Sequence, residues 1–240
     1  MLQISILGAS GRMGRNLIEA VHNDEQTQLH SATVRPSSNL LNIDAGELAG
    51  IPKQGVQLQA QSNVQLDAGT VIIDFTLPEA LSANLAWAIA HKTPIVIGTT
   101  GLNESQLATL QNAATQIPIV FAANYSVGVN LLIKLSQQAA KIMGQTADIE
   151  IIETHHRYKV DAPSGTALAL GEGIAQTLQR DLKQDAVYGR EGYTGERPQQ
   201  QIGFATVRGG DVVGDHTVLF AELGERIELT HKASSRMTFA

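Results

Sequence analysis

The chain contains no cysteine among its 240 residues, which excludes disulfide bonds, thiolate metal sites and thiol redox switches. It also lacks an excess of positive charge, since its formal net charge is −6 at pH 7. Nucleic acids and anionic membranes are bound by basic surfaces, so we expect neither as a partner. No apolar run approaches membrane-spanning length, and the opening Met1–Ile4 is already strand-like, which leaves no room for a signal peptide. These absences favour a cytoplasmic protein whose local cationic clusters bind small anions.

The histidines give no metal-ligand spacing. No pair of them is separated by four residues on an expected helix, and cysteine is absent. We therefore expect no zinc site. Five histidines are scattered and are expected to have structural or surface roles, namely His22, His30, His91, His216 and His231.

The N-terminus predicts a strand, a glycine turn and a helix. The apolar Leu2–Leu7 runs directly into Gly8–Gly14, and Asn16–Val21 has a helical pattern. Glycine lets the backbone turn sharply and approach a pyrophosphate, which the amides of the helix N-terminus then hold. The spacing is G-x-x-G-x-x-G rather than G-x-G-x-x-G, so a purely structural tight turn is the alternative.

The first half of the chain alternates strands with helices, which predicts a doubly wound parallel sheet. Capping boxes at Thr76–Glu79 and Asn103–Gln106 open two of the helices. Small, polar turns at Phe75–Thr76, Gly98–Gly101 and Ala122–Tyr125 follow three strands, where such sheets bind ligands; ordinary loop chemistry is the alternative. The expected strands after the first are Leu29–Val34, Val71–Phe75, Ile95–Ile97 and Ile119–Phe121.

After about Tyr125 the pattern changes to α+β. Three strands joined by turns within Gln201–Lys232 predict consecutive hairpins that extend the strand at Asp148 into a mixed sheet, with helices Asn130–Met143 and Ser164–Leu178 on one side. The Gly-, Arg- and Gln-rich stretch Tyr188–Gln201 is expected to be a long mobile loop. The uncovered face of the sheet favours self-association. We expect a dinucleotide-binding domain over 1–126, with 237–240 returning to it, and a second domain over 127–236.

A cationic connection lies between the strand at Asp148 and the helix from Ser164. It contains His155, His156, Arg157 and Lys159. A helix N-terminus exposes unpaired N–H groups and the positive end of its dipole. Gly165 and Thr166 are thus predicted to bind a carboxylate that Lys159 or His156 also contacts. A solvated basic loop ahead of a capped helix is the alternative.

Taken together, these motifs closely resemble the bacterial 4-hydroxy-tetrahydrodipicolinate reductase (dihydrodipicolinate reductase) family, over essentially the whole chain. The most specific string is His-His-Arg-x-Lys-x-Asp-x-Pro-Ser-Gly-Thr-Ala, beginning at His155. The resemblance implies the reductive step of diaminopimelate and lysine biosynthesis, in which NAD(P)H reduces a cyclic dicarboxylate imine, and a homotetramer joined through the second domain's sheet. The motifs are Gly8–Gly14, Asp44–Gly50, Ile97–Gly101, Phe121–Asn130, Glu153–Ala167 and His231–Arg236.

The resemblance also implies roles for individual residues. His155 and Lys159 would be catalytic. The substrate carboxylates would be bound by His156, Lys159, Gly165 and Thr166. The pyrophosphate would be cradled by Gly8, Ala9, Ser10, Gly11, Arg12 and Met13. The nicotinamide end would be held by Gly98, Thr99, Thr100, Ala122, Ala123, Asn124 and Tyr125.

The end of the second strand bears on the cofactor. Many family members have an acidic residue there, whereas this chain has Val34 followed by Arg35. Valine cannot accept hydrogen bonds from the ribose of NADH, and arginine can pair with the 2′-phosphate of NADPH. We expect NADPH to be preferred and NADH to remain usable. If Arg35 points into solvent, the enzyme is dual-specific.

Two other functions share part of this pattern. A related amino-acid dehydrogenase, such as aspartate or homoserine dehydrogenase, has the glycine turn and a lysine. A nucleotide-sensing module would keep the dinucleotide fold without catalysis, but the presence of both His155 and Lys159 favours an enzyme. Family members continue beyond the position of Ala240 through a helix that returns to the first domain, and we expect a chain extended by that helix to melt at a higher temperature.

Overall fold

The computed structural model describes residues 1–240, which divide into two compact units. The first unit comprises Met1–Ala123 with Phe239–Ala240, and the second comprises Asn124–Thr238. The division falls between Ala123 and Asn124, slightly before the boundary expected after residue 126. Each unit has its own sheet and its own hydrophobic core. None of the helices is long and apolar enough to cross a membrane.

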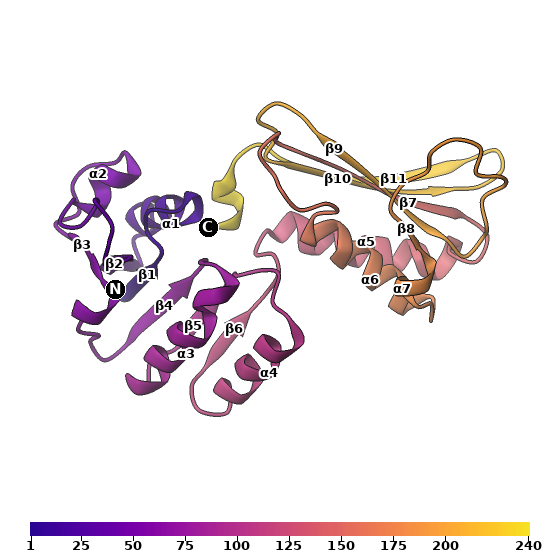
Figure 1. The fold of residues 1–240 in the computed structure, drawn as a ribbon. Coiled ribbons are helices and arrows are strands. Elements are labelled where there is room, and N and C mark those ends of the chain that lie inside the picture. Colours follow the sequence, from indigo (N-terminus) through magenta and orange to yellow (C-terminus); the bar gives the residue numbers. More distant parts are fainter. The chain divides into compact units, whose positions relative to one another are not determined.

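The first unit is built on a six-stranded, all-parallel sheet (Figure 1). The strand order reverses between β1 and β4, as in dinucleotide-binding folds, so the predicted doubly wound sheet is confirmed. In spatial order the strands are β3 (Leu58–Ala60), β2 (Thr27–Val34), β1 (Leu2–Leu7), β4 (Thr70–Asp74), β5 (Ile95–Ile97) and β6 (Ile119–Phe121). The helices are α1 (Arg12–Asn23), α2 (Ala45–Ala49), α3 (Leu81–Ala90) and α4 (Glu104–Ala113), with short 3-10 turns at Gln61–Asn63 and Pro78–Ala80.

Hydrophobic clusters cover both faces of this sheet. Ile6 and Leu7 are neighbours in β1, yet Ile6 packs in a cluster with Leu17 of α1, and Leu7 packs in another with Leu85 of α3. Successive side chains of a strand point to opposite faces, so both faces of β1 are buried here. The buried Ser5 of β1 is satisfied by a hydrogen bond between its hydroxyl and that of Ser31 at 2.6 Å.

One local prediction for the first unit was wrong. Thr76 does not cap a helix, because its hydroxyl donates to Asp74 instead, at 2.6 Å, and α3 begins only at Leu81, after the 3-10 turn. The short strand β3 was not anticipated. The other capping box is confirmed, since Asn103 and Gln106 exchange side-chain-to-backbone hydrogen bonds at the start of α4.

The second unit has a five-stranded mixed sheet, as predicted. The hairpin expected between β9 and β10 is absent, because β7 lies between them, parallel to β9 and antiparallel to β10. Their connection passes over the end of β7, where Gly209 N–H donates to the carbonyl of His155 and Gly210 accepts from the N–H of Arg157. In spatial order the strands are β11 (Arg226–Ala233), β10 (Gly214–Ala221), β7 (Asp148–His155), β9 (Ile202–Arg208) and β8 (Ala186–Val187).

Helices α5 (Val127–Met143) and α6 (Gly165–Thr177) cover one face of this sheet, as predicted (Figure 1). Their apolar residues pack on the inward-facing side chains of β7, β9 and β10, and a short helix, α7 (Leu182–Asp185), follows α6. The opposite face retains two exposed apolar side chains, Ile152 at 37% and Val207 at 47%.

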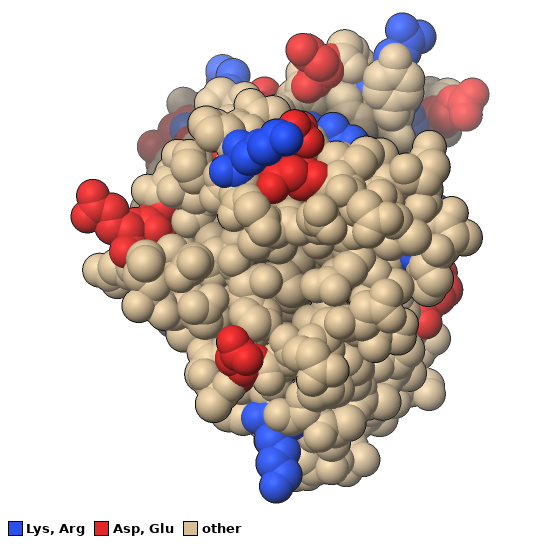
Figure 2. Space-filling model, turned by 90° about the vertical axis from the view of Figure 1, so that its left-hand side faces the viewer, with Lys and Arg blue, Asp and Glu red and all other residues tan.

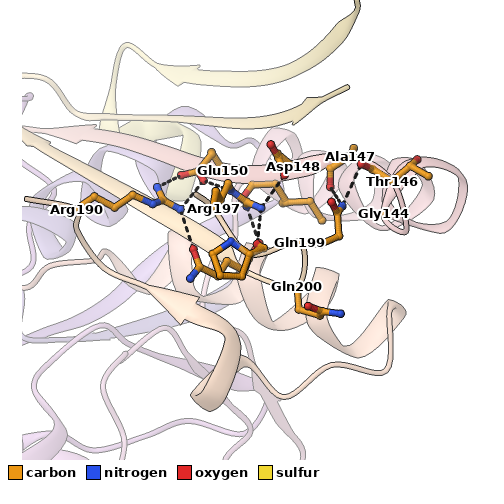
Figure 3. A network of polar contacts seen from close by, with 12 residues as sticks. Gly144, Thr146, Ala147, Asp148, Glu150, Arg190, Arg197, Gln199 and Gln200 are labelled. Carbon is orange, nitrogen blue, oxygen red and sulfur yellow. Dashed lines mark hydrogen bonds and ion pairs between the residues drawn. The ribbon is translucent and has the colours of Figure 1, made fainter. Parts of the chain in front are cut away.

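The segment Tyr188–Gln201 has no helix or strand, but polar contacts fasten it to β7 (Figure 3). Arg190 donates to both carboxylate oxygens of Glu150, at 3.1 and 2.9 Å, and these hydrogen bonds raise the pKa of the guanidinium. Arg197 pairs with Glu150 at 3.1 Å and with Asp148 at 2.8 Å. Two arginines of the loop that was expected to be mobile therefore fasten it to strand β7.

Candidate active site

The glycine turn of the first unit has the geometry that close approach to a ligand requires. Gly8 has φ +67°, and a Cβ there would lie 2.8 Å from the methyl group of Thr76. A Cβ on Gly14 would lie 2.7 Å from Cα of Ala9, so α1 packs directly on the turn. Gly11 caps α1 without a side-chain acceptor, which leaves the first amides of the helix available to an anion. These residues fit a dinucleotide pyrophosphate.

A buried carboxylate, Asp74, organises the neighbouring turns. It ends β4 and is fully buried. It accepts hydrogen bonds from the backbone and hydroxyl of Thr76, at 2.8 and 2.6 Å, from Asn84 at 2.8 Å and from Thr99 at 3.4 Å. The turns after β4 and β5 are thereby joined through one side chain. Asp74 was missed from the sequence, although an acidic residue at the end of the apolar Val71–Phe75 run was a usable signal.

The predicted nicotinamide-binding turns lie at the carboxyl ends of adjacent strands. Gly98 follows β5, and a side chain at this position would overlap the ring of Phe75. Ala122 follows β6, and its N–H donates to the carbonyl of Ile97 at 3.3 Å. The structure brings these turns together in the first unit, whereas Asn124 and Tyr125 belong to the second.

Two residues at the end of β2, Val34 and Arg35, were considered for contact with the cofactor's ribose, and they differ in exposure. Val34 is buried in the core, and Arg35 follows it with an exposed side chain. Only Arg35 therefore presents a polar side chain to a ligand at this point.

Charged side chains are few on the face drawn in Figure 2, and in its upper part acidic and basic groups lie beside one another.

Glu153 is a buried acid of the second unit, with a side chain that is 1% exposed. One carboxylate oxygen is hydrogen-bonded to Nδ1 of His155 and also accepts a hydrogen bond from Arg208 Nη1 at 2.9 Å. The other accepts from Arg208 Nη2 at 2.9 Å and from the backbone N–H of Ser164 at 3.1 Å. The carboxylate therefore ties β7 to β9 and to the start of α6.

These contacts set the protonation states of Glu153 and His155. Burial by itself raises the pKa of Glu153, but the hydrogen bonds from Arg208 and His155 hold it below its ordinary value. Burial lowers the pKa of His155, and Glu153 only partly opposes this, since the charges of Lys159 and Arg208 lower it further. An ionised carboxylate thus faces an imidazole that is mainly neutral near pH 7.

His216 of β10 is part of the same cluster. Its Nε2 lies 3.0 Å from the hydroxyl of Ser164, and its ring meets that of His155 edge-on, with centroids 5.1 Å apart. Burial, followed by the charge of His155, lowers the pKa of His216 to about 4, so it is neutral near pH 7. The expectation that His216 is one of the scattered histidines was wrong, because β10 pairs with β7 and places it opposite Glu153.

The cationic connection follows β7. Lys159 is held by Asp161, with its Nζ 2.8 and 2.9 Å from the two carboxylate oxygens. Burial opposes ionisation of Asp161, but the bond from Lys159 keeps its pKa below the ordinary value. Backbone N–H of Lys159 donates to the carbonyl of His156, a residue that is itself buried. The two residues predicted to bind a carboxylate are therefore joined by a tight turn.

The start of α6 completes the arrangement. Ser164 caps the helix, its hydroxyl accepting from Ala167 N–H at 3.1 Å. Gly165 and Thr166 open the helix, and Asn124 donates to the hydroxyl of Thr166 at 3.0 Å. The second unit therefore gathers His155, His156, Lys159, Gly165 and Thr166 between the end of β7 and α6. Such an arrangement can bind carboxylates and transfer a proton.

The sequence missed Glu153, Arg208 and the role of Ser164 in this cluster. Glu153 precedes His155 by two residues in an expected strand, which puts both side chains on one face, so the alternation itself was a signal. Arg208 comes from β9, and its proximity to Glu153 depends on the parallel pairing of β7 with β9. That pairing was not part of the predicted hairpin arrangement.

Both halves of the chain match known family models. Residues 2–125 match the model described as dihydrodipicolinate reductase, N-terminus, and residues 128–240 match dihydrodipicolinate reductase, C-terminus. A 4-hydroxy-tetrahydrodipicolinate reductase from Pseudoalteromonas atlantica is 62% identical over 100% of this chain and 90% of its own length. One from Alkalilimnicola ehrlichii is 60% identical over 99% of this chain and 89% of its own length.

A solved structure has the same fold at low sequence identity. It is the dipicolinate-bound dihydrodipicolinate reductase from Paenisporosarcina sp. TG-14, with a TM-score of 0.69 and 23% identity over 100% of this chain and 90% of that one. Since the family models and two close relatives span the whole chain, the resemblance found in the motifs is confirmed. The chain belongs to the dihydrodipicolinate reductase family.

Proposed function

We propose that this protein reduces 4-hydroxy-tetrahydrodipicolinate to tetrahydrodipicolinate in lysine biosynthesis, with NADPH as the preferred reductant. Each turnover consumes one NAD(P)H and one proton and releases one water. The observation that carries the proposal is the cluster in the second unit, where Glu153 and His155 adjoin a lysine and the N-terminus of α6. Bound NAD(P)H supplies the hydride.

The substrate is a dicarboxylate, and the start of α6 supplies donors for it. The N–H groups of Gly165 and Thr166 lie in the first turn, at the positive end of the helix dipole. His156 and Lys159 add side chains from the connection that precedes the helix. We assign these four residues to the substrate carboxylates.

His155 and Lys159 are the proposed catalytic residues. Hydride addition to the conjugated imine places negative charge on the ring nitrogen, and a protonated group beside it neutralises that charge. The lowered pKa of His155 makes it mainly neutral near pH 7, whereas Lys159 forms an ion pair with Asp161 at 2.8 Å. Both side chains remain candidates for the group that gives the proton to nitrogen.

The cofactor is proposed to be bound through three sets of residues, all in the first unit except Asn124 and Tyr125. The glycine turn, Gly8 to Met13, cradles the pyrophosphate, and Gly98, Thr99, Thr100 and the Ala122–Tyr125 turn hold the nicotinamide end. Arg35 is proposed to pair with the 2′-phosphate of NADPH, since the neighbouring Val34 is buried and offers no carboxylate to the ribose of NADH.

We further propose a homotetramer assembled through the open face of the second sheet. The exposed Ile152 and Val207 give that face an apolar character. Val207→Lys should reduce the molar mass measured by light scattering, while Ile142→Lys on the exposed side of α5 should not. A wild-type monomer would contradict this proposal. The cytoplasmic location expected from the sequence stays a prediction.

The function is tested by following nicotinamide absorbance with substrate made freshly by dihydrodipicolinate synthase from pyruvate and aspartate semialdehyde. We expect oxidation of NADPH only in the complete mixture. Oxidation with aspartate semialdehyde alone would instead indicate an amino-acid dehydrogenase of the homoserine type. Cofactor binding with no oxidation in any mixture would indicate a nucleotide-binding module.

A further inference from the structure

We infer that Glu153 is a positioning residue for the proposed reduction, which it serves by fixing the tautomer and orientation of His155. The inference rests on the proposed function insofar as it concerns turnover. The tautomer itself is a property of the protein alone and is measurable without substrate.

The carboxylate of Glu153 is surrounded by donors. Arg208 donates to both of its oxygens at 2.9 Å, and the backbone of Ser164 donates at 3.1 Å. An ionised carboxylate can only accept hydrogen bonds, so the ring nitrogen facing it must carry a proton. In neutral His155 that nitrogen is Nδ1, which leaves the lone pair on Nε2.

Nε2 of His155 is consequently the atom that gains and loses the proton. It makes no hydrogen bond within the protein and is not among the buried polar atoms without a partner. Gly214 leaves room beside it, since a Cβ at that position would lie 2.9 Å from Nε2. A side chain on β10 would therefore cover the nitrogen that Glu153 leaves free.

Four ionisable groups surround His155. Glu153 lies on the same strand, Lys159 on the connection after it, Arg208 at the end of β9 and His216 on β10. Glu153 is the acid among them and favours the charged imidazole, while Lys159 and Arg208 oppose it. Replacing Glu153 with a neutral residue should therefore lower the pKa of His155.

Glu153 could also matter only as a structural link between β7, β9 and α6. Glu150 provides a matched control for that role, because it lies three residues earlier on β7 and pairs with two arginines, Arg190 and Arg197 (Figure 3). Three residues along a strand bring its side chain to the opposite face, away from His155. Glu150→Gln therefore removes a comparable ion pair without touching the imidazole.

The kinetic test is a double-mutant cycle measured on the whole 240-residue chain. Glu153→Gln should lower kcat by at least about tenfold, because a glutamine has one acceptor oxygen for four donors and its amide can donate to Nδ1. In the His155→Gln background the same change should lower kcat by less than about twofold further, since a residue acting through His155 has nothing left to position. Glu150→Gln should change kcat by less than about twofold in either background. Equal losses from Glu153→Gln in both backgrounds would overturn the inference.

The tautomer is read directly from a long-range 1H–15N correlation spectrum of 15N-histidine-labelled protein. The His155 signals are assigned by their loss in His155→Gln. Wild type should show neutral His155 protonated on Nδ1, and Glu153→Gln should move the proton to Nε2 and lower the midpoint of the titration. A wild-type proton on Nε2 would contradict the inference even if Glu153→Gln did not fold. Absence of any NADPH oxidation by wild type would instead refute the proposed function.

Discussion

Asn124 Nδ2 donates a hydrogen bond to the hydroxyl oxygen of Thr166 at 3.0 Å. The orientation of the amide is fixed from its other side, since Asn124 Oδ1 accepts from the N–H of Ser126 at 2.8 Å. The hydroxyl of Thr166 accepts this hydrogen bond and keeps its O–H as a donor, which we assign to the substrate. Asn124, which is assigned to the nicotinamide end of the cofactor, thus orients Thr166, which is assigned to the substrate.

Replacing Thr166 with valine removes this donor while preserving the shape of the side chain. A hydrogen bond to a charged group contributes about 1.5–3 kcal/mol, which corresponds to roughly ten- to a hundredfold in affinity. We expect KM for the dicarboxylate to rise by about that factor, with little change in the Kd for NADPH. Thr177→Val serves as the control, because Thr177 bonds only Gly173 at the other end of α6. An unchanged KM in Thr166→Val would remove Thr166 from the substrate site.

His155→Gln and Lys159→Ala should each lower kcat by at least about 10²-fold, the usual scale for a removed proton donor or acceptor. The affinity for NADPH, measured by fluorescence titration, should survive, because both residues lie in the second unit and the glycine turn lies in the first. His22→Gln, an exposed histidine of the first unit, should leave both quantities unchanged. Loss of NADPH affinity in proportion to kcat would show that the two variants disturb the fold instead.

Arg35→Ala should weaken NADPH binding by about ten- to a hundredfold and leave NADH binding nearly unchanged, because only NADPH has the 2′-phosphate. Titrating both cofactors against both proteins measures the difference. Arg226→Ala, an exposed arginine of the second unit, is the control for the loss of one positive charge. Equal wild-type affinities for NADPH and NADH would mean that Arg35 does not discriminate between them.

The buried His216 should make folding stability depend on pH. Its folded-state pKa is lowered to about 4 from 6.5, so between these values the unfolded chain binds the proton first. Stability from this residue is then complete above about pH 6.5 and lost as pH falls towards 4, by an amount on the order of 3 kcal/mol. The thermal midpoint of unfolding should fall as the pH is lowered over this range. In His216→Gln the thermal midpoint should depend less steeply on pH. An equally steep slope in the variant would show that other groups cause the dependence.

The residues that were predicted correctly are those whose signals are local. The glycine turn, the Asn103 cap and the alternation of strands and helices depend on neighbours in the sequence, and each is present. The run Leu2–Leu7 predicted a buried strand for the same reason, and Ile4 to Leu7 are buried.

What was missed depends on contacts between distant strands. Arg208 reaches Glu153 because β9 pairs in parallel with β7, and His216 joins them because β10 pairs with the other edge of β7. Three strands connected by short turns predict successive hairpins, and nothing local shows that β7 lies between β9 and β10. Asp74 is similar, since its partners Asn84 and Thr99 come from later elements.

The most direct measurement is the transfer of the hydride itself. NADPH labelled with deuterium at the transferred position of the nicotinamide is supplied with freshly made 4-hydroxy-tetrahydrodipicolinate, and the product is examined by mass spectrometry. The proposed reaction predicts tetrahydrodipicolinate that carries a single deuterium, formed in equal amount to NADP⁺ and not formed by His155→Gln at a comparable rate. Product without deuterium, or NADPH oxidation without tetrahydrodipicolinate, would contradict the assignment of this chain as the reductase.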